Sequence, residues 1–341
     1  MATIRDVAKK ANVSISTVSR VLNGHKMISD ETRQKVLKTV EELNYTPKPR
    51  GRASHKSNRK SLLVLTPSPV PQITNGIFEG ARDHGYDAMI TIAQSNNDGA
   101  YVKYVEEGLF SGIVLLNIRL SSNISEFLLS KCPIVQCNEY DVFPKANLVT
   151  IDNSGATRDI TNHLIETGKR RLAFISPQYI YGYQVKFALD REYGFRRALD
   201  ESNIDLNPEF IVRTDFELGI ENYREYVEKI HSIVRNLLSY PEDERPNGIV
   251  CSNDQIAASC INAAKAMGLR IPEDLAVTTF DNTFTCFMTD PFITSIKQPN
   301  FELGYESANL LVSVINEKPT VSKQVLLGHS IIKRGSSVIT K

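Results

Sequence analysis

The sequence predicts a small α-helical N-terminal domain followed by a larger α/β body with two parallel-sheet subdomains. Within residues 1–45, apolar side chains recur at helical spacing, and Ser or Thr residues precede each run. From Ser61 onward, short apolar segments alternate with amphipathic segments, as in the strand–helix–strand units of a parallel sheet. The alternation begins again after an amphipathic segment at 156–167, which indicates a second sheet.

The composition is that of an ordinary globular protein without a membrane span. Of the 341 residues, 41% are hydrophobic and 23% are charged, and the length suits about two or three domains. The N-terminus has no apolar signal segment, and no apolar stretch approaches the ~18 residues that a membrane span needs. The 5 cysteines are scattered without a C-x-x-C pair, so we expect reduced thiols in a bacterial cytoplasmic protein.

Charge is distributed unevenly along the chain. Residues 1–60 hold 14 Lys/Arg and 5 Asp/Glu, whereas the remaining 281 residues hold 26 and 34, although the net charge is only +1. A basic head on a mildly acidic body favours a polyanion as the partner of the head. A solvated basic tail is the alternative, and it is weakened by the helix signals within the head.

The head carries the signals of three helices. Thr3 and Asp6 resemble a capping box, Ser14 precedes a second helical run, and Ser29 opens a third. The residues expected on the buried sides of these helices are Ile4, Val7, Ala8, Ala11, Val18, Val21, Leu22, Val36, Leu37, Val40 and Leu43. Two short helices joined by a tight turn and braced by a longer helix form a helix-turn-helix, which binds DNA.

The second helix of the head suits a DNA major groove. Its residues expected to face away from the apolar side are Ile15, Ser16, Ser19 and Arg20. Hydroxyl groups reach phosphates or base edges, and an Arg side chain can donate two hydrogen bonds to guanine. For Ser14 and Thr17, roles in capping and packing are alternatives to DNA contacts.

Segments 3–8, 13–23 and 31–47 resemble the signature of the lactose-repressor (LacI/GalR) family of transcriptional regulators, and the match continues to the C-terminus. The resemblance implies that Ile15, Ser16 and Arg20 contact bases. The residues that it implies hold phosphates are Thr3, Thr17, Ser19 and Asn23. The partner would be a double-stranded, pseudopalindromic operator bound by a homodimer. The chain stops at Lys341 without a leucine-heptad tail, so a dimer is expected rather than a tetramer.

The body contains two successive series of predicted strands. The expected strands are 62–65, 87–93, 112–116 and 133–137 in the first series, and 172–176, 209–212, 248–251 and 275–280 in the second. Amphipathic helices are expected at 73–84 and 156–167. In sheets of this kind, ligands bind beyond the carboxyl ends of the strands.

Signals of an enzyme are absent from the sequence of the body. None of the 18 glycines lies two residues from another, which excludes G-x-G-x-x-G, and G-x-x-x-x-G-K-[ST] does not occur. The 6 histidines show no metal-ligand spacing, and there is no nucleophile elbow. We therefore expect no enzyme, no cofactor and no metal. A periplasmic solute-binding protein would share the body, but it needs a signal peptide and no basic helical head.

The body resembles the family's periplasmic-binding-protein-like core, with matching segments at 168–175, 191–195, 252–257, 268–274, 280–282 and 291–299. The resemblance implies a ligand cleft between two subdomains and chain crossings near 157–162, 293–297 and 322–326. The expected domains are a helix-turn-helix at 1–45, a basic linker at 46–60, one subdomain at 61–160 with 295–324, and another at 161–294 with 325–341.

The residues that match the family's ligand positions are Asn138, Arg191, Phe216, Asn253, Asp281 and Gln298. An Arg and an Asp can each make two hydrogen bonds and so suit vicinal hydroxyls, while an aromatic face can stack on a sugar or a base. Asn138 could instead be a turn residue after a strand, and Phe216 could belong to the core. Arg191 and Asp281 could form a surface ion pair, although the ligand role is favoured.

The identity of the small-molecule effector is left open by the sequence. Loop 67–74 is about four residues shorter than in relatives and has no aromatic residue. Segment 136–140 is somewhat similar to the family's cytidine repressors, which makes a nucleoside the second candidate after a sugar. Whether the effector releases the DNA or recruits it is also open, and release is the commoner behaviour in the family.

The linker departs most from the family pattern. Relatives carry a short hinge helix with a leucine that wedges into the minor groove, but Ser54 stands at that position. Pro49 and Gly51 disfavour a helix, and segment 48–60 is strongly basic. Lys48, Arg50 and Arg52 are expected to contact DNA. Segment 49–52 resembles an AT-hook, which would favour an A·T-rich operator centre, and a flexible basic linker is the alternative.

Overall fold

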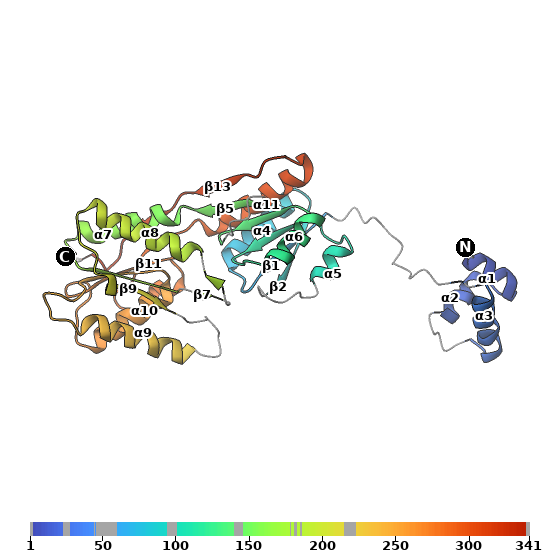
Figure 1. Cartoon of the computed structure of the whole chain (residues 1–341), viewed down its shortest axis with the longest axis horizontal. Helices are drawn as coiled ribbons and strands as arrows, with labels where there is room; N and C mark the ends of the chain where they lie inside the picture. Colours follow the sequence, from blue (N-terminus) through green and yellow to red (C-terminus); the bar gives the residue numbers. More distant parts are fainter. Residues whose placement is uncertain are drawn as a thin grey trace. The chain divides into compact units, whose positions relative to one another are not determined.

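The computed structural model describes residues 3–22, 28–43, 45, 60–93, 101–139, 146–177, 179–180, 183–184, 186–214 and 223–338. The chain forms two compact units, Met1–Arg59 and Lys60–Lys341. Figure 1 draws the helices and strands of each unit. Among the described residues, no helix combines the length and the apolar character that would let it cross a membrane.

The first unit contains the three predicted helices, α1 (Ile4–Ala11), α2 (Ile15–Leu22) and α3 (Asp30–Glu42). The predicted capping box is confirmed, because the Thr3 amide donates to Asp6 Oδ2 at 2.8 Å and the Asp6 amide donates to Thr3 Oγ1. The hydroxyl of Ser14 accepts from the Thr17 amide at 3.1 Å, and Ser29 caps α3. Polar caps thus set where each helix begins.

The core of the first unit consists of one face from each helix. Its buried side chains are Val7, Ala8, Ala11, Val18, Val21 and Val36. Two expectations were wrong. Leu37 is 44% exposed, because α3 packs through Val36 and Val40 and so turns the neighbouring Leu37 to solvent. Ser19 is only 8% exposed, because α2 contacts both α1 and α3 and therefore buries a wider sector than its apolar side.

The second unit contains two six-stranded sheets, each covered by helices, and each defines a lobe. The strands of the first lobe, in spatial order, are β13 (Gln324–Leu327), β5 (Asn147–Ile151), β4 (Ile134–Cys137), β3 (Gly112–Leu116), β1 (Ser61–Thr66) and β2 (Asp87–Ile92). Its helices are α4 (Pro71–Asp83), α5 (Tyr101–Glu106), α6 (Ser122–Lys131) and α11 (Asn300–Glu317). The strand pairs of this sheet are parallel.

Strand β1 shows why the first lobe has helices on both faces. Leu62 and Val64 belong to the core beneath α4 and α11, whereas Leu63 and Leu65 belong to the core beneath α5 and α6. Successive side chains of a strand point to opposite faces, so an uninterrupted apolar strand needs cover on both. The run Leu62–Leu65 therefore specifies a central strand.

The second lobe has a similar arrangement, except that its edge strand β14 pairs with β12 in the antiparallel direction. Its strands, in spatial order, are β14 (Ser330–Ile332), β12 (Thr294–Lys297), β11 (Ala276–Phe280), β10 (Gly248–Cys251), β6 (Leu172–Pro177) and β9 (Ile211–Thr214). Its main helices are α7 (Asn153–Glu166), α8 (Lys186–Glu201), α9 (Tyr223–Leu238) and α10 (Asp254–Ala266). Helices α7 and α8 pack against one another on one face, and α9 and α10 pack together on the other (Figure 1).

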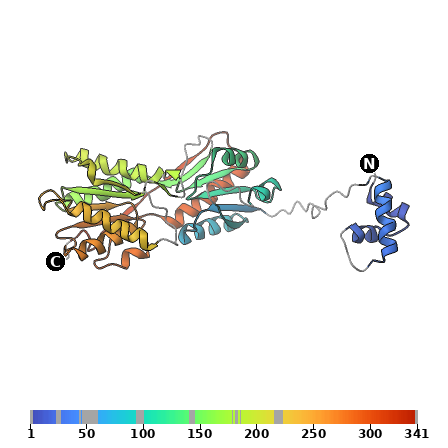
Figure 2. The same cartoon turned by 60° about the horizontal axis from the view of Figure 1, so that its bottom comes forward.

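The chain crosses between the lobes after β5, after β12 and after β13. Both views show the two lobes of the second unit as separate α/β bodies joined by these segments (Figure 2). The expected boundaries differ from this, because they placed the start of α7 and most of β12 in the first lobe and most of β13 in the second. Helix α7 packs on α8, β12 pairs with β11, and β13 pairs with β5.

Most predicted strands are confirmed to within about two residues. Of the strands in the two six-stranded sheets, β5, β12, β13 and β14 were not predicted. Each lies beside a chain crossing or at a sheet edge, and β13 and β14 are short, half-exposed strands with only two or three consecutive apolar residues. Their strand conformation is stabilised by pairing with residues distant in the sequence, so local patterns carry little signal for it.

Candidate functional site

Helix α2 exposes three of the four residues that the sequence predicts on its outward face, while the fourth, Ser19, is buried. Ile15 is 44% exposed although it is a large aliphatic residue, and Ser16 and Arg20 are also exposed. An exposed Ile beside an exposed Arg suits apolar and hydrogen-bonding contacts with base edges. The structure therefore brings the three expected base-contacting side chains onto one accessible surface.

The hydroxyl residues of the head divide into two groups. Ser14 and Thr17 take part in helix capping, with their side-chain oxygens 2.8 Å apart, and Ser16 Oγ lies 2.7 Å from Ser14 Oγ. Thr3 is committed to the cap of α1 but remains exposed. Ser19 is buried, so a phosphate contact by its hydroxyl requires a local rearrangement. Asn23, Lys48, Arg50 and Arg52 lie outside the described residues.

Arg191 is the centre of the expected ligand site. It lies on α8 with 3% of its surface exposed, and its guanidinium donates to Asn153 Oδ1 at 2.9 Å and to the Ser252 carbonyl at 2.5 Å. The guanidinium carbon lies 3.6 Å from the centre of the Phe280 ring. Asp281 Oδ1 lies 3.7 Å from Arg191 Nη2. Arg191 is thus a buried organising cation and not half of a surface ion pair.

Burial lowers the pKa of Arg191 to about 10, while the charges of Asp281, Glu139 and Asp254 act in the opposite direction. Arg191 therefore stays charged at neutral pH. A buried cation is tolerated only when hydrogen bonds and opposite charges surround it. The elements that supply these groups are the start of α7, the segments that follow β4, β10 and β11, and the start of α10.

Three buried polar atoms around Arg191 have no hydrogen-bond partner among the described residues. They are Asn153 Nδ2, Ser252 Oγ and Gln298 Oε1. Asn153 and Ser252 each bind Arg191 through another atom, and Gln298 Nε2 donates to Asp281 Oδ1. Since buried polar groups are nearly always paired in native proteins, this cluster can accept a polar ligand that offers both donors and acceptors.

The remaining expected residues have different surroundings. Asn253 caps α10, with its Oδ1 accepting from the Ile256 amide at 2.9 Å, so its amide nitrogen is the part left for a ligand. Asn138 has a positive φ of 70° after β4, as a turn residue would, and its Nδ2 donates to Asn117 at 2.7 Å. Phe216 lies outside the described residues.

Sequence reasoning missed Asn153, Ser252 and Asp254. Asn153 lies at the carboxyl end of β5, and the sequence does not predict this strand, so it gives no signal for a site residue there. Ser252 and Asp254 belong to a motif that was noted, but only Asn253 was assigned a role. The available signal was their position directly after β10, where parallel sheets place their functional residues.

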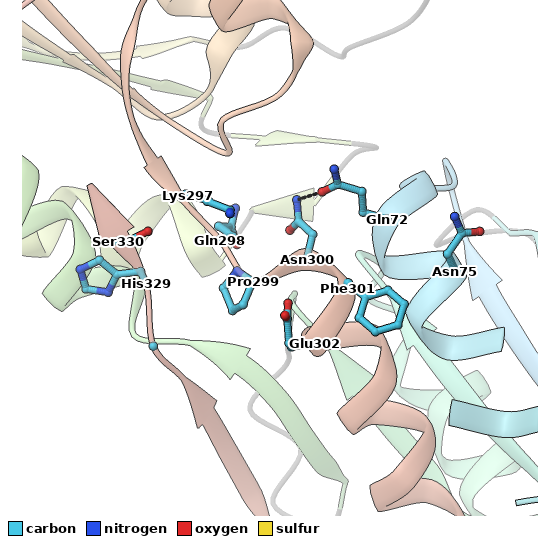
Figure 3. A pocket seen from close by; sticks show the side chains of 11 residues that line it. Gln72, Asn75, Lys297, Gln298, Pro299, Asn300, Phe301, Glu302, His329 and Ser330 are labelled. Atoms are coloured by element: carbon cyan, nitrogen blue, oxygen red, sulfur yellow. Dashed lines mark hydrogen bonds between the residues drawn. The ribbon is translucent and has the colours of Figure 1, made fainter. Parts of the chain in front are cut away.

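A cavity of about 550 Å³ adjoins the crossing segments. Figure 3 shows its side chains, which come from α4, from the start of α11 and from the crossings at 297–300 and 328–330. In its lining, Asn300 Nδ2 donates a hydrogen bond to Gln72 Oε1 at 3.4 Å. Of the expected ligand residues among the described ones, Gln298 alone lines this cavity. Because Gln298 also donates to Asp281, it lies between the cavity at the crossing segments and the polar groups around Arg191.

Asp254 gives the site a testable pH dependence. Its side chain is fully buried and accepts from the amide and hydroxyl of Thr283 at 2.6 and 2.7 Å. Burial, followed by the charge of Asp281, raises its pKa to about 6. A carboxyl with a raised pKa stabilises the folded state at low pH, and this contribution is lost as the pH rises from about 4 through about 6.

The unfolding free energy of the wild type is therefore expected to fall by up to about 3 kcal/mol between about pH 4 and pH 7. In Asp254→Asn this contribution to the fall should be absent. The amide oxygen of Asn can keep the bonds from Thr283. Denaturant unfolding of wild type and variant at both pH values checks this. Equal declines in the two proteins would contradict it.

Two family models match the chain: "Bacterial regulatory proteins, lacI family" over residues 3–48, and "Periplasmic binding protein-like domain" over residues 161–337. The transcriptional regulator RegA of Clostridium saccharobutylicum is 30% identical, covering 99% of this chain and 100% of that protein. The chain belongs to the lacI family of bacterial regulatory proteins.

Other members of the family agree with this assignment. The transcriptional repressor CytR of Escherichia coli strain K12 is 31% identical to this lacI-family regulator, covering 98% of this chain and 96% of CytR. A crystal structure of the lac repressor dimer bound to operator and the anti-inducer ONPF has the same fold, with a TM-score of 0.67 at 24% identity over 99% of both chains. The protein is thus a DNA-binding transcriptional regulator.

Proposed function

We propose that this lacI-family regulator is a ligand-responsive repressor that binds a pseudopalindromic operator as a dimer. Its effector, a sugar first and a nucleoside second, binds around Arg191 between the lobes. We infer a ligand response from the buried polar atoms of Asn153, Ser252 and Gln298 that have no hydrogen-bond partner among the described residues. A ligand with several hydroxyl groups could satisfy both the donor and the acceptors, and it would favour the lobe arrangement that brings it into contact.

The proposal is tested by titrating the protein onto a labelled duplex from its own upstream region, with and without candidate sugars and nucleosides. We expect specific binding to the duplex at protein concentrations in the low nanomolar to micromolar range. We also expect sugars or nucleosides to change the affinity for the duplex. Specific binding that no sugar or nucleoside changes would remove the proposed effector class. Absence of specific binding to any upstream duplex would contradict the repressor role.

Within the head, we propose that Ile15, Ser16 and Arg20 read base edges. Arg20→Ala is expected to weaken operator binding by about 1–3 kcal/mol and to relax the preference at one base pair per half-site. Lys38→Ala, which removes an exposed charge from α3, is the matched control. Fluorescence anisotropy with single-base operator variants measures both effects. An equal loss on every sequence would assign Arg20 to a phosphate.

The proposed dimer has a candidate contact surface on the second lobe. Phe284, Met288 and Phe292 are 76%, 68% and 52% exposed, and such aromatic and Met side chains are favoured in protein interfaces. Phe284→Asp with Met288→Asp is expected to shift the protein toward monomer in sedimentation at micromolar concentration. Leu109→Asp, at an exposed site in the first lobe, is the control. A wild-type tetramer, or a double variant that stays dimeric, would contradict this assignment.

A further inference from the structure

Glu139 lies directly after β4 in the first lobe, yet its carboxylate binds the second lobe. Its surface is 1% exposed, and its Oε1 accepts a hydrogen bond from the backbone amide of Lys186 at 3.0 Å. Lys186 is the first residue of α8. The first amides of a helix have no acceptor within the helix, so this carboxylate from one lobe caps a helix of the other.

Helix α8 also carries Arg191, five residues after the capped amide. The charge of Glu139 favours the charged form of Arg191, against the lowering of the Arg191 pKa by burial. A carboxylate at the N-terminus of a helix additionally interacts favourably with the helix dipole. Glu139 therefore acts on both the start of α8 and the guanidinium that organises the ligand cluster.

Two side chains near the start of α8 make hydrogen bonds or ion pairs within the second lobe. The ammonium group of Lys186 binds Asp190 at 2.6 Å, one turn further along the same helix. Arg191 itself binds Asn153 and Ser252, which belong to α7 and to the end of β10. The bond from Glu139 differs from these because it spans the boundary between the lobes.

We propose that Glu139 is a positioning residue that fixes how far the lobes close over the Arg191 cluster, by capping α8 across the boundary between them. This inference rests on one part of the proposed function, namely that a ligand alters DNA binding by changing how far the two lobes close. The residue acts on the ligand site through α8, so its effect is visible in the ligand-free protein. Without the hydrogen bond between Glu139 and the Lys186 amide, the two lobes should separate more readily.

Either half of the hydrogen bond can be removed separately. Glu139→Ala removes the acceptor, and Lys186→Pro removes the donor at the first helical position, where proline is tolerated. Glu139→Gln keeps an acceptor oxygen but removes the charge. Lys186→Ala keeps the amide and removes the side chain that binds Asp190, so it is the matched control for Lys186→Pro.

The experiment measures distances between spin labels at Leu109→Cys in the first lobe and Asp243→Cys in the second, both at exposed positions. The full-length chain is used without DNA or ligand, and labelled chains are diluted with unlabelled protein so that distances arise within one chain. The native cysteines are buried, and burial raises the pKa of Cys132 to about 11 and of Cys137 to about 12, so labels attach to the introduced thiols.

We expect Glu139→Ala and Lys186→Pro each to broaden the distance distribution and to add a population with a changed distance. Glu139→Gln and Lys186→Ala should match the wild-type distribution. A wild-type distribution in both Glu139→Ala and Lys186→Pro, or an equal change in Lys186→Ala, would overturn the proposal. If either Glu139→Ala or Lys186→Pro does not fold, the distance distribution of the other variant tests the proposal. Because neither DNA nor effector is present, failure here is separate from failure of the proposed function.

Discussion

Arg191→Ala is expected to abolish the effector response while operator binding in the absence of effector stays close to that of wild type. The substitution removes the donor that binds Asn153 and Ser252 and leaves the Asp281 carboxylate without its cation. Removing one partner of a fully buried charge pair costs about 3–5 kcal/mol, and because the Asp281 side chain is 29% exposed, the cost here should lie at the lower end of that range. We therefore also expect the free energy of unfolding of the second unit to fall by about that amount.

Two measurements separate these effects. Denaturant unfolding followed by circular dichroism gives the loss of stability, and operator titration below the unfolding range gives the response to effector. Arg197→Ala is the matched control, because Arg197 lies on the same helix in an exposed pair with Glu201, and such pairs contribute about 0–1 kcal/mol. A normal response at the normal effector concentration in Arg191→Ala would remove Arg191 from the ligand site.

Gly304→Ala is expected to destabilise the first lobe by about 1–3 kcal/mol, because the crossing of α4 and α11 has no room for a side chain. A Cβ at position 304 would lie 1.9 Å from the Ile73 carbonyl oxygen and 2.8 Å from the Ile77 amide nitrogen. Gly76, on the opposite helix, faces the Phe301 carbonyl oxygen about as closely. Alanine favours a helix by about 1 kcal/mol over glycine, and the clash with a backbone atom outweighs this gain.

Gly328→Ala is the control for this prediction, because no atom lies within 4 Å of the Cβ that it would add. Its unfolding free energy should stay within about 0.5 kcal/mol of wild type. Thermal and denaturant unfolding of both variants measure the difference. Wild-type stability in Gly304→Ala would show that α4 and α11 can separate without loss of packing.

Local patterns in the sequence determined the helical head almost completely. The polar residues Thr3, Ser14 and Ser29 cap the helices where they were predicted to, and the apolar spacing identified the buried sides of α1 and α2. Both features depend on residues within a few positions of one another, so they can be read without the fold. Ser19 and Leu37 were assigned to the wrong surface because their burial depends on how three helices meet.

In the body, the sequence patterns determined the two parallel-sheet series, and the resemblance to the family named Arg191, Asp281 and Gln298, which the structure brings together. Only the tertiary structure decided which atoms there lack a partner, because Asn153 and Ser252 reach Arg191 from distant segments. It also placed the chain crossings, since β5 pairs with β13 from near the C-terminus. Strand pairing and buried hydrogen bonds between distant residues are set by packing, which one-dimensional periodicity does not encode.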